Sequence, residues 1–409
     1  MKSIAFVQKM FRDYYEDFSL NKSTLMIEKR EFGFTSFEGW MLRHKSFKNK
    51  EELESFLRDS VPRDVYFSCA YYEDPQAEME KKGWLGADLI FDIDADHIPT
   101  SCDKVHDKWI CGNCGFAGKG VAPEKCPACG GEKFNESTWP CETCLASAKA
   151  ESVKLLDMLT QDFGFSENEV CVFFSGHRGY HVHVKSKSIR TLDTVARKEI
   201  VDYVCGLGLE VPSDTLNKKS QSLSNVYLGS SSKDFGWRKR IALGVKDVIL
   251  DTNEQDLVNI GVGRNVAKAL LSNKDVISKR LLNEGTLLRV KGVGFESWKK
   301  IAEQSIKMQS AKVDTVVTTD IHRLIRLANT LHGKTGFKKV EFPISVIDDF
   351  DPFKSAVAFK KGFAVIFVSD APEFRLGDEM FGPYKNQKIE LPTAAAVLLI
   401  CKGRAEVVE

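Results

Sequence analysis

Several features common to other protein classes are missing from this chain of 409 residues. No apolar run approaches the roughly 18 residues that a membrane-spanning helix needs, and the first residues lack the apolar stretch of a secretory signal. We therefore expect a cytoplasmic protein with no targeting signal and no membrane segment. The net charge is only +1, from 58 basic and 57 acidic residues, so the chain as a whole has no bulk attraction for nucleic acid.

Charge is nevertheless gathered locally. The range 84–103 contains five aspartates and no lysine or arginine, whereas 171–190 contains four basic residues and no acidic one. An acidic patch beside a basic patch suits metal ions bound together with phosphates, but solvated faces that never meet would give the same pattern.

Hydrophobic residues make up 43% and charged residues 28%, which is typical of a soluble globular protein. Apolar periodicity predicts strands at 30–34, 40–47, 65–70, 87–95, 170–174, 180–184, 315–318, 340–342, 355–359 and 364–368. It predicts helices at 3–18, 50–58, 145–163, 189–206 and 320–328, a mostly helical stretch at 251–309, and a polar connection at 212–233. Strands at both ends with helices between them indicate an α/β core formed by 1–101, 145–243 and 311–409, interrupted by a helical subdomain at 244–310.

Cysteine usage is uneven. Seven of the eleven cysteines lie between residues 102 and 144, a segment with too few apolar residues for a core of its own, and we expect a metal-held insert there. Two Cys-x-x-Cys pairs have the spacing of a zinc ribbon: Cys111, Cys114, Cys126 and Cys129. The remaining ligand types add up to a second site for four ligands: Cys102, His106, Cys141 and Cys144. A redox role fits poorly because the pairs come in twos among glycines and prolines, and both ions are expected to be structural.

The strand predicted at 87–95 carries two carboxylates, Asp92 and Asp94, on one face. Residues i and i+2 of a strand lie about 6–7 Å apart, so the two charges repel each other unless a cation lies between them. Magnesium prefers such oxygen ligands. Surface strands also carry such pairs by chance.

A glycine turn follows at 175–181. Ser175, His177, Arg178 and His181 offer a hydroxyl, two imidazoles and a guanidinium, which are donors suited to phosphate oxygens. The alternative interpretation is a glycine hairpin with ordinary surface charge.

A third group of polar residues begins at Asp314, which we place at the start of a strand. A threonine at 318–319 is expected to cap the next helix, and Asp320 is then explained by the helix dipole. Asp314 has no such structural explanation. Arg323 and Arg326 are predicted to lie three apart on one helix face, available to phosphates or to solvent.

These motifs occur in a definite order: Arg30–Phe32, Met41–His44, Phe91–Asp94, Ser175–His181, Asp314 and Leu331–Gly336. The ordered set resembles the catalytic small subunit of the archaeal and eukaryotic DNA primases, and its character looks archaeal. The resemblance implies the α/β primase-polymerase (archaeo-eukaryotic primase) core, with a zinc-binding insert at 102–144 and a helical subdomain.

The resemblance also implies roles for residues. Asp92, Asp94 and Asp314 would bind two catalytic Mg²⁺ or Mn²⁺ ions. Ser175, Arg178 and His181 would hold the incoming triphosphate. A further nucleotide-binding set would comprise Glu31 near the sugar and Arg43, His177, Arg323, Arg326 and His332. His177 stands where some relatives have a second arginine, so a weaker and pH-dependent phosphate contact is expected there. The family commonly has one zinc site in this region; the segment from about Cys111 to Gly131 looks like an extra ribbon.

The implied function is template-directed synthesis of short primers from nucleoside triphosphates on single-stranded DNA during replication. A large iron–sulfur subunit would be a separate polypeptide forming a heterodimer, since this chain has no further cysteine set for a cluster. An archaeal primase would be associated with the nucleoid. The alternatives are a primase-polymerase of DNA repair or gap filling and a non-catalytic zinc-ribbon nucleic-acid-binding protein. Two further segments, 261–263 and 290–294, each resemble half of a helix-hairpin-helix, for which a glycine-capped helical subdomain is the favoured interpretation.

Overall fold

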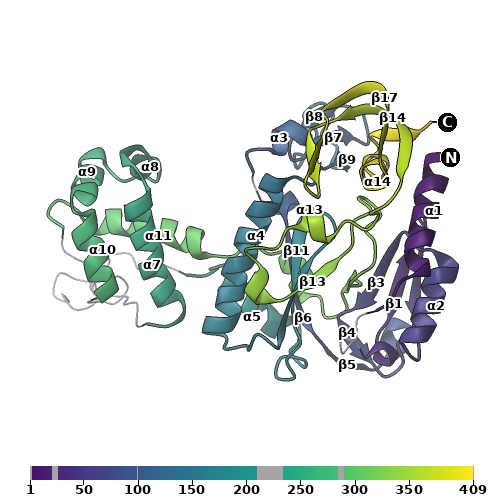
Figure 1. Cartoon of the computed structure of the whole chain (residues 1–409). Helices are drawn as coiled ribbons and strands as arrows, with labels where there is room; N and C mark the ends of the chain where they lie inside the picture. The colour runs from purple at the N-terminus through teal and green to yellow at the C-terminus, as the bar shows by residue number, and fades with distance from the viewer. Residues whose placement is uncertain (1, 21–25, 99, 210–233, 284–289, 409) are drawn as a thin grey trace. The chain divides into compact units, whose positions relative to one another are not determined.

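The computed structural model describes residues 2–20, 26–98, 100–209, 234–283 and 290–408. The chain forms two compact units. The core unit comprises Met1–Val153, Ser166–Lys198 and Lys312–Glu409, and the helical unit comprises Lys154–Phe165 and Glu199–Ala311 (Figure 1). The range 199–243, which the sequence placed with the core, thus clusters with the helices.

The first sheet of the core unit is antiparallel with strand order β12-β3-β1-β2. Its strands are β1 (Phe32–Thr35), β2 (Met41–Lys45), β3 (Asp64–Ser68) and β12 (Leu324–Arg326). Two helices, α1 (Lys2–Glu16) and α2 (Lys50–Ser60), bury Phe11 and Leu57 in the same hydrophobic cluster as Phe32 of the sheet (Figure 1). The polar side chain of Asn49 starts α2 by accepting from the backbone N–H of Glu52.

The second sheet has the order β13-β10-β11-β6 and is also antiparallel. Its strands are β6 (Leu89–Asp94), β10 (Val170–Phe174), β11 (Gly179–Val184) and β13 (Val340–Phe342). The register pairs His181 with Asp92 and Gly179 with Asp94. The ends of β10 and β13 coincide with the strands predicted at 170–174 and 340–342, which are confirmed.

A third sheet, β17-β14-β18, is formed near the C-terminus and is packed by α14 (Thr393–Cys401) (Figure 1). Its strands are β14 (Phe363–Ala371), β17 (Tyr384–Pro392) and β18 (Ala405–Val407). The backbone N–H of Val407 donates to Ser3 Oγ at 3.0 Å, so the two ends of the chain meet in this unit. Two-stranded ladders join β4 (Ala70–Tyr72) to β5 (Trp84–Ala87) and β15 (Phe374–Leu376) to β16 (Glu379–Phe381).

The cysteine-rich insert has its own small sheet, of order β8-β7-β9. Its elements are α3 (Asp103–His106), β7 (Lys108–Cys111), β8 (Ala117–Lys119) and β9 (Phe134–Ser137), and α4 (Glu142–Asp157) follows. Trp109 is buried and packs edge-on against Phe134, with 5.2 Å between ring centroids.

The described residues of the helical unit are mostly helical. After the π-helical turn η4 (Met158–Asp162) the helices are α5 (Thr194–Val204), which begins in the core unit, α7 (Gly236–Asp251), α8 (Glu254–Asn259), α9 (Arg264–Ser272), α10 (Lys274–Asn283) and α11 (Phe295–Gln309). The buried guanidinium of Arg240 forms ion pairs with Asp157 and Asp162 at 2.9 and 2.6 Å. Gly263 and Gly294 are the N-caps of α9 and α11, so the glycines noted in the sequence begin helices. The polar connection predicted at 212–233 lies outside the described residues.

Two predicted elements near residue 320 are wrong. The β-branched run at 315–318 predicted a strand, but it forms the short helix α12 (Thr315–Thr319) because the Asp314 side chain caps its first N–H groups. The range 320–328 predicted a helix, but its middle forms β12 at the edge of the first sheet, paired with β3. Arg323 and Arg326 therefore do not share a helix face.

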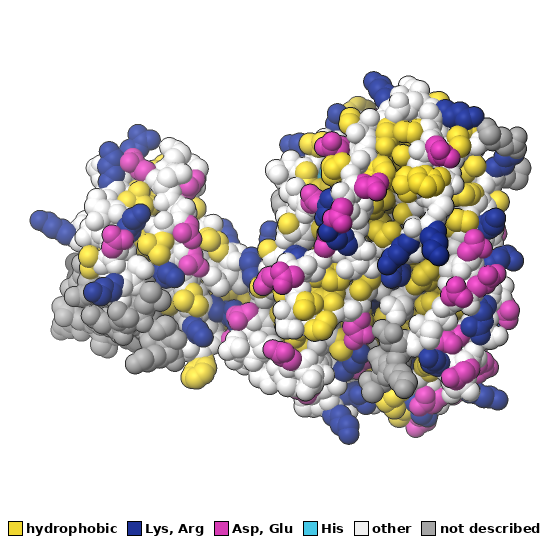
Figure 2. Space-filling view, in the orientation of Figure 1, with side chains coloured by type: hydrophobic (Ala, Val, Ile, Leu, Met, Phe, Trp, Pro, Cys, Tyr) yellow, Lys and Arg dark blue, Asp and Glu magenta, His cyan; other side chains and the backbone are white. Residues whose placement is uncertain are grey.

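The strand predicted at 355–359 is also wrong. The helix α13 (Pro352–Ser355) ends there, and it begins at Asp351, whose side chain accepts from the backbone N–H of Phe353. Among the described residues, no helix has both the length and the apolar character needed to cross a membrane. Figure 2 shows positive and negative side chains interspersed over the face in view, as the small net charge leads one to expect.

Candidate active site and metal centres

Strand β6 places the first two candidate carboxylates. Asp92 and Asp94 alternate with the buried Phe91 and Ile93, so the apolar neighbours hold both carboxylates on the other face. Burial raises the pKa of Asp92, and the charges of Asp94 and Asp314 raise it further, to about 7. Lys339 and Arg323 offset this repulsion only in part, and such a cluster of carboxylates is the electrostatic environment that a divalent cation relieves.

The structure brings the third carboxylate, Asp314, to the same strand. The backbone N–H of Asp314 donates to the backbone oxygen of Asp92 at 2.8 Å. Its Oδ1 accepts from the N–H groups of Val316 and Val317 at 2.9 and 3.2 Å. Asp314 therefore has the structural role that the sequence did not reveal, and the cap fixes the direction of its carboxyl group beside Asp92.

Strand β11 carries basic groups opposite the carboxylates. His181 Nε2 lies 3.5 Å from Asp92 Oδ1, and its Nδ1 is buried without a hydrogen-bond partner in the described structure. Burial lowers the pKa of His181 well below its usual value, and the charges of Lys339 and Arg326 act in the same direction. His181 is thus neutral in the isolated chain. Lys339 is fully buried, and its Nζ donates to the backbone oxygen of Arg326 at 2.9 Å.

The glycine turn between β10 and β11 is held by Ser175. Its Oγ accepts from the backbone N–H groups of His177 and Gly179 at 3.3 and 3.2 Å. Gly176 has a φ of +89°, which favours glycine, and a Cβ there would lie 3.0 Å from His332 Cβ. The Ser175 hydroxyl hydrogen remains available for a ligand, because both of these bonds use its oxygen as the acceptor.

The glycine turn contacts the 331–336 motif through one imidazole from each segment. The rings of His177 and His332 stack with 5.1 Å between centroids. Lys402, which follows α14, lies with its Nζ 2.5 Å from His177 Nε2, so this nitrogen accepts. Burial and then the charge of Lys402 lower the pKa of His177 well below its usual value. These surroundings favour the neutral form of His177, and the pH-dependent phosphate contact expected from the sequence stays a prediction.

Two arginines of the 323–326 segment have different surroundings. Arg326 is buried, and its Nη1 bonds Asp64 Oδ1 at 2.7 Å; the same oxygen accepts from the N–H of Gly333 at 2.8 Å. Arg323 is partly exposed, and its charge lowers the pKa of both Asp92 and His181, which places it at the carboxylate cluster.

Glu31 and Arg43 form a pair at the first sheet. Glu31 is fully buried, and its carboxylate bonds Lys82 Nζ at 2.6 Å and Arg43 Nε at 3.1 Å. The Arg43 side chain is 41% exposed. The glutamate therefore orients the arginine, and the arginine is the member of the pair that a ligand can reach.

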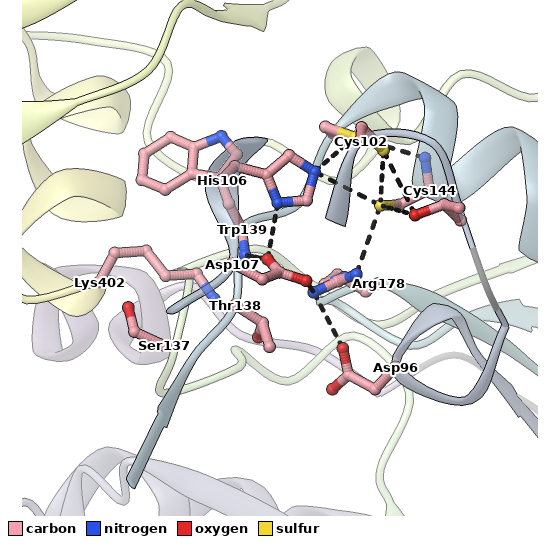
Figure 3. Close-up of polar contacts among 12 residues, drawn as sticks. Asp96, Cys102, His106, Asp107, Ser137, Thr138, Trp139, Cys144, Arg178 and Lys402 are labelled. Carbon is pink, nitrogen blue, oxygen red and sulfur yellow. Dashed lines mark hydrogen bonds and ion pairs between the residues drawn. The ribbon is translucent and has the colours of Figure 1, made fainter. Parts of the chain in front are cut away.

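Arg178 is buried among protein groups. Its side chain is 1% exposed, and its guanidinium contacts Asp107 Oδ2 at 2.7 Å, Asp96 Oδ1 at 2.9 Å and Cys144 Sγ at 3.3 Å. Figure 3 shows the guanidinium between these three groups.

The ligand atoms of Cys102, His106, Cys141 and Cys144, which we call the buried cluster, lie within 4.8 Å of one another. Cys102 Sγ lies 3.4 Å from both Cys141 Sγ and Cys144 Sγ, and His106 Nε2 lies 3.2 Å from Cys141 Sγ. Zinc with Zn–S distances of about 2.3 Å in a tetrahedron gives S–S edges of about 3.8 Å, so these four ligands fit one ion after small shifts.

The ligand atoms of Cys111, Cys114, Cys126 and Cys129, which we call the ribbon cluster, also lie within 4.8 Å of one another. Two Sγ–Sγ distances are 3.6 Å (Cys111 to Cys129) and 3.7 Å (Cys114 to Cys126). Backbone N–H groups of Gly115 and Gly130 close tight turns after the first cysteine of each pair. Sequence spacing thus grouped both sets of four as the structure does.

Sequence reasoning missed several residues at these sites. Asp107, Asp96 and Lys402 contact candidate residues, and Asp64 and Lys339 are buried charges beside them. A signal existed for Asp107, since metal-binding histidines commonly donate to a carboxylate, and for Asp96, which extends the run of Asp92 and Asp94. No pattern along the chain marks the other three.

Comparison with known proteins agrees with this geometry. The family model described as DNA primase small subunit matches residues 131–344. The chain is 34% identical over 429 residues to a protein of Methanothrix thermoacetophila named DNA primase small subunit PriS, covering 99% of each chain. It is 32% identical to a protein of that name from Nitrosopumilus maritimus, covering 99% of this chain and 98% of the other.

A third protein of that name, from Picrophilus torridus, is 34% identical over 364 residues, with 87% of this chain and 86% of the other covered. Because the first two relatives each cover 99% of this chain, the similarity spans nearly its whole length, including strands β6 and β11. It confirms the resemblance inferred from the ordered motifs. The chain belongs to the family of DNA primase small subunits.

Proposed function

We propose that Asp92, Asp94 and Asp314 form the cation site at which this DNA primase joins nucleoside triphosphates into primers on single-stranded DNA. Family membership makes the chain a DNA-directed primase, a nucleotidyltransferase of replication, and does not favour the repair or non-catalytic alternatives. The hydrogen bond from Asp314 N–H to the Asp92 oxygen carries the assignment of these residues, because it joins a carboxylate of the last hundred residues to the β6 pair.

The three carboxylates fit a pair of hard cations. Burial and then their mutual repulsion raise the pKa of Asp92, and oxygen ligands of this kind are those that Mg²⁺ and Mn²⁺ prefer. Asp92, Asp94 and Asp314 would hold these ions, which would supply activation of the attacking hydroxyl and charge neutralisation at the leaving pyrophosphate. The chain itself would orient the reactants, and no protein nucleophile is required.

The donors around the carboxylates would bind the triphosphate and sugar. We assign this role to Ser175, His181, Arg323 and His332, with Arg43 oriented by Glu31 at the sugar end. Arg326 would contribute its charge from a buried position fixed by Asp64. His177 would act through its stack on His332, with Lys402 as the adjacent charged group.

Both cysteine clusters would hold structural zinc. Each presents four ligands and leaves no ligand position for water, so neither is expected to take part in the chemistry. The range 102–144 is then an insert held by metal. The expected partners are the template strand, nucleoside triphosphates and a large iron–sulfur subunit, since a small subunit implies a heterodimer.

Primer synthesis on unprimed single-stranded DNA with labelled nucleotides and Mn²⁺ tests the cation site. Asp94→Asn and Asp314→Asn should lower synthesis by at least about 10³-fold, since each removes a cation ligand. Asparagine keeps an oxygen that can cap α12, so Asp314→Asn separates the charge from the fold. Asp351→Asn is the matched control, because Asp351 caps α13 in the same way. Wild-type rates in Asp94→Asn or Asp314→Asn would refute the assignment.

A further inference from the structure

The side chains between the buried cluster and strand β6 form a continuous polar chain. His106 Nδ1 lies 2.6 Å from Asp107 Oδ1, and Asp107 Oδ2 lies 2.7 Å from Arg178 Nη1. The same Nη1 lies 2.9 Å from Asp96 Oδ1, and the Asp96 N–H donates to Asp94 Oδ1 at 3.0 Å. Figure 3 shows this path from His106 to Asp96.

Hydrogen-bond chemistry fixes the histidine end of this polar path. A carboxylate can only accept a hydrogen bond, so Asp107 accepts from His106 Nδ1–H, and His106 Nε2 is left facing the cysteine sulfurs. The second contact to the cluster is direct, from Arg178 Nη2 to Cys144 Sγ at 3.3 Å. One guanidinium therefore holds both a ligand of the cluster and the partner of another ligand.

Protein groups contact both terminal nitrogens of Arg178 in this structure. The Arg178 side chain is 1% exposed, and its Nη1 and Nη2 reach two carboxylates and a cluster sulfur. Loss of the guanidinium would leave the buried Asp107 carboxylate without this cation, which is costly for a buried charge.

We propose that Arg178 is a positioning residue that couples metal occupancy of the buried cluster to cation binding at the β6 carboxylates, through Asp107 on one side and Asp96 on the other. The proposal rests on the proposed function, because it assumes zinc in the cluster and divalent cations at Asp94. The coupling is reciprocal, so a change that weakens ion binding at one site also weakens ion binding at the other.

The test measures zinc release and Mn²⁺ affinity and does not depend on primer synthesis. Zinc release from the full chain is followed with a colorimetric zinc indicator in a Cys114→Ser background, where the ribbon cluster is broken and the signal reports the buried cluster. Mn²⁺ affinity is measured by electron paramagnetic resonance of the free ion. Arg178→Lys, which keeps the charge but loses the fork, should release zinc at least about 10-fold faster and raise the Kd for Mn²⁺ about 5-fold.

The matched control is Arg240→Lys. Arg240 is also a buried guanidinium between two aspartates, but it lies in the helical unit and touches no cluster ligand. It should leave both measurements at the wild-type value. Circular dichroism checks folding, and Asp107→Asn, which keeps the volume of the side chain, should reproduce both effects if Arg178→Lys fails to fold.

Wild-type zinc release in Arg178→Lys would overturn the proposal, as would a raised KM for nucleotide with zinc release and Mn²⁺ affinity unchanged, since that pattern marks a phosphate ligand. Failure of the proposed function would instead be seen in protein in which Arg178 is intact. A wild-type chain without zinc, or an Asp94→Asn chain that binds Mn²⁺ as tightly as wild type, would refute that function and the coupling with it.

Discussion

The two cysteine clusters have similar ligands but differ in what surrounds them. The buried cluster has Asp107 and Arg178 as polar neighbours, and these lead through Asp96 to the end of strand β6. The ribbon cluster alternates buried and exposed cysteines and is held by short backbone turns of its own. Ligand identity alone therefore says little about what a structural metal does, because the groups behind the ligands decide which part of the protein it stabilises.

The largest difference is expected between Cys144→Ser and Cys114→Ser. Cys144→Ser removes a cluster ligand and a contact of Arg178, so we expect primer synthesis to fall by at least about 100-fold, with weaker zinc binding. Cys114→Ser should lose one zinc ion per chain and retain synthesis within about 3-fold. Zinc content and primer synthesis measured on the same samples check this; equal loss of activity in both would abolish the distinction between the clusters.

A pair of glycines provides a second contrast. A Cβ at Gly179 would lie 2.2 Å from Ile93 O, and a Cβ at Gly118 would lie 2.2 Å from Trp109 Cζ2. Gly179→Ala should push β11 away from β6 beside Asp94, lowering stability by about 2–4 kcal/mol and synthesis by at least about 10-fold. Gly118→Ala should disturb the ribbon sheet alone. Urea unfolding and zinc release compare the two, and the prediction fails if Gly118→Ala lowers synthesis as much.

The carboxylate site should respond to pH where the ribbon does not. Because the pKa of Asp92 is raised to about 7, protons compete with cations there, and Mn²⁺ affinity should fall up to about tenfold per pH unit below 7. Ribbon zinc should be retained between pH 8 and 6. Titrating Mn²⁺ binding against pH tests this, with Asp92→Asn as the variant that should lose the dependence.

The same shift has a consequence for folding. A raised carboxyl pKa destabilises the cation-free folded state increasingly as pH rises from the unfolded value toward 7. Asp92→Asn should therefore stabilise the chain by about 4 kcal/mol at pH 8 and by less at pH 5. Urea unfolding without added divalent cations measures it; a gain that is larger at pH 5 would contradict the sign.

The smallest effect is expected where the ribbon touches the rest of the core unit. Lys108 Nζ lies 2.7 Å from Asp370 Oδ2, and the two side chains are 41% and 54% exposed. Exposed pairs of this kind contribute less than about 1 kcal/mol, so Lys108→Ala should leave stability and synthesis nearly unchanged. A large loss of activity would show that the orientation of the ribbon matters, and it would break the contrast drawn between the clusters.

The elements best predicted from the sequence are those determined by residues that are neighbours along the chain. The apolar run at 170–174 and the alternation that ends at Asp94 specify β10 and β6, because neighbours along the chain determine which faces are buried. The 315–328 segment was misassigned because its structure depends on distant partners: Asp314 bonds Asp92, and β12 pairs with β3. The family motifs nevertheless predicted that Asp314 lies near Asp92, and the structure has the two residues hydrogen-bonded.

The contacts of Arg178 lay beyond sequence reasoning for the same reason. Its role as a phosphate ligand followed from residue type and resemblance, whereas its burial depends on Asp107 and Asp96, each more than 70 residues away along the chain. Nothing in a one-dimensional pattern shows which donor of a glycine turn faces inward. Lys402 illustrates the same limit, since it reaches His177 from near the end of the chain.

The tie between Asp314 and Asp92 also bears on how the protein is made. Residues more than 200 apart must meet before the three carboxylates share one site, and β13, at residues 340–342, completes the sheet that carries them. During synthesis on the ribosome, β6, β10 and β11 emerge long before either partner does. A nascent or truncated chain that stops before residue 314 therefore has two of the three carboxylates and an open sheet edge at β10. Only when the last quarter of the chain has been made can Asp314 and β13 join the sheet that carries Asp92 and Asp94.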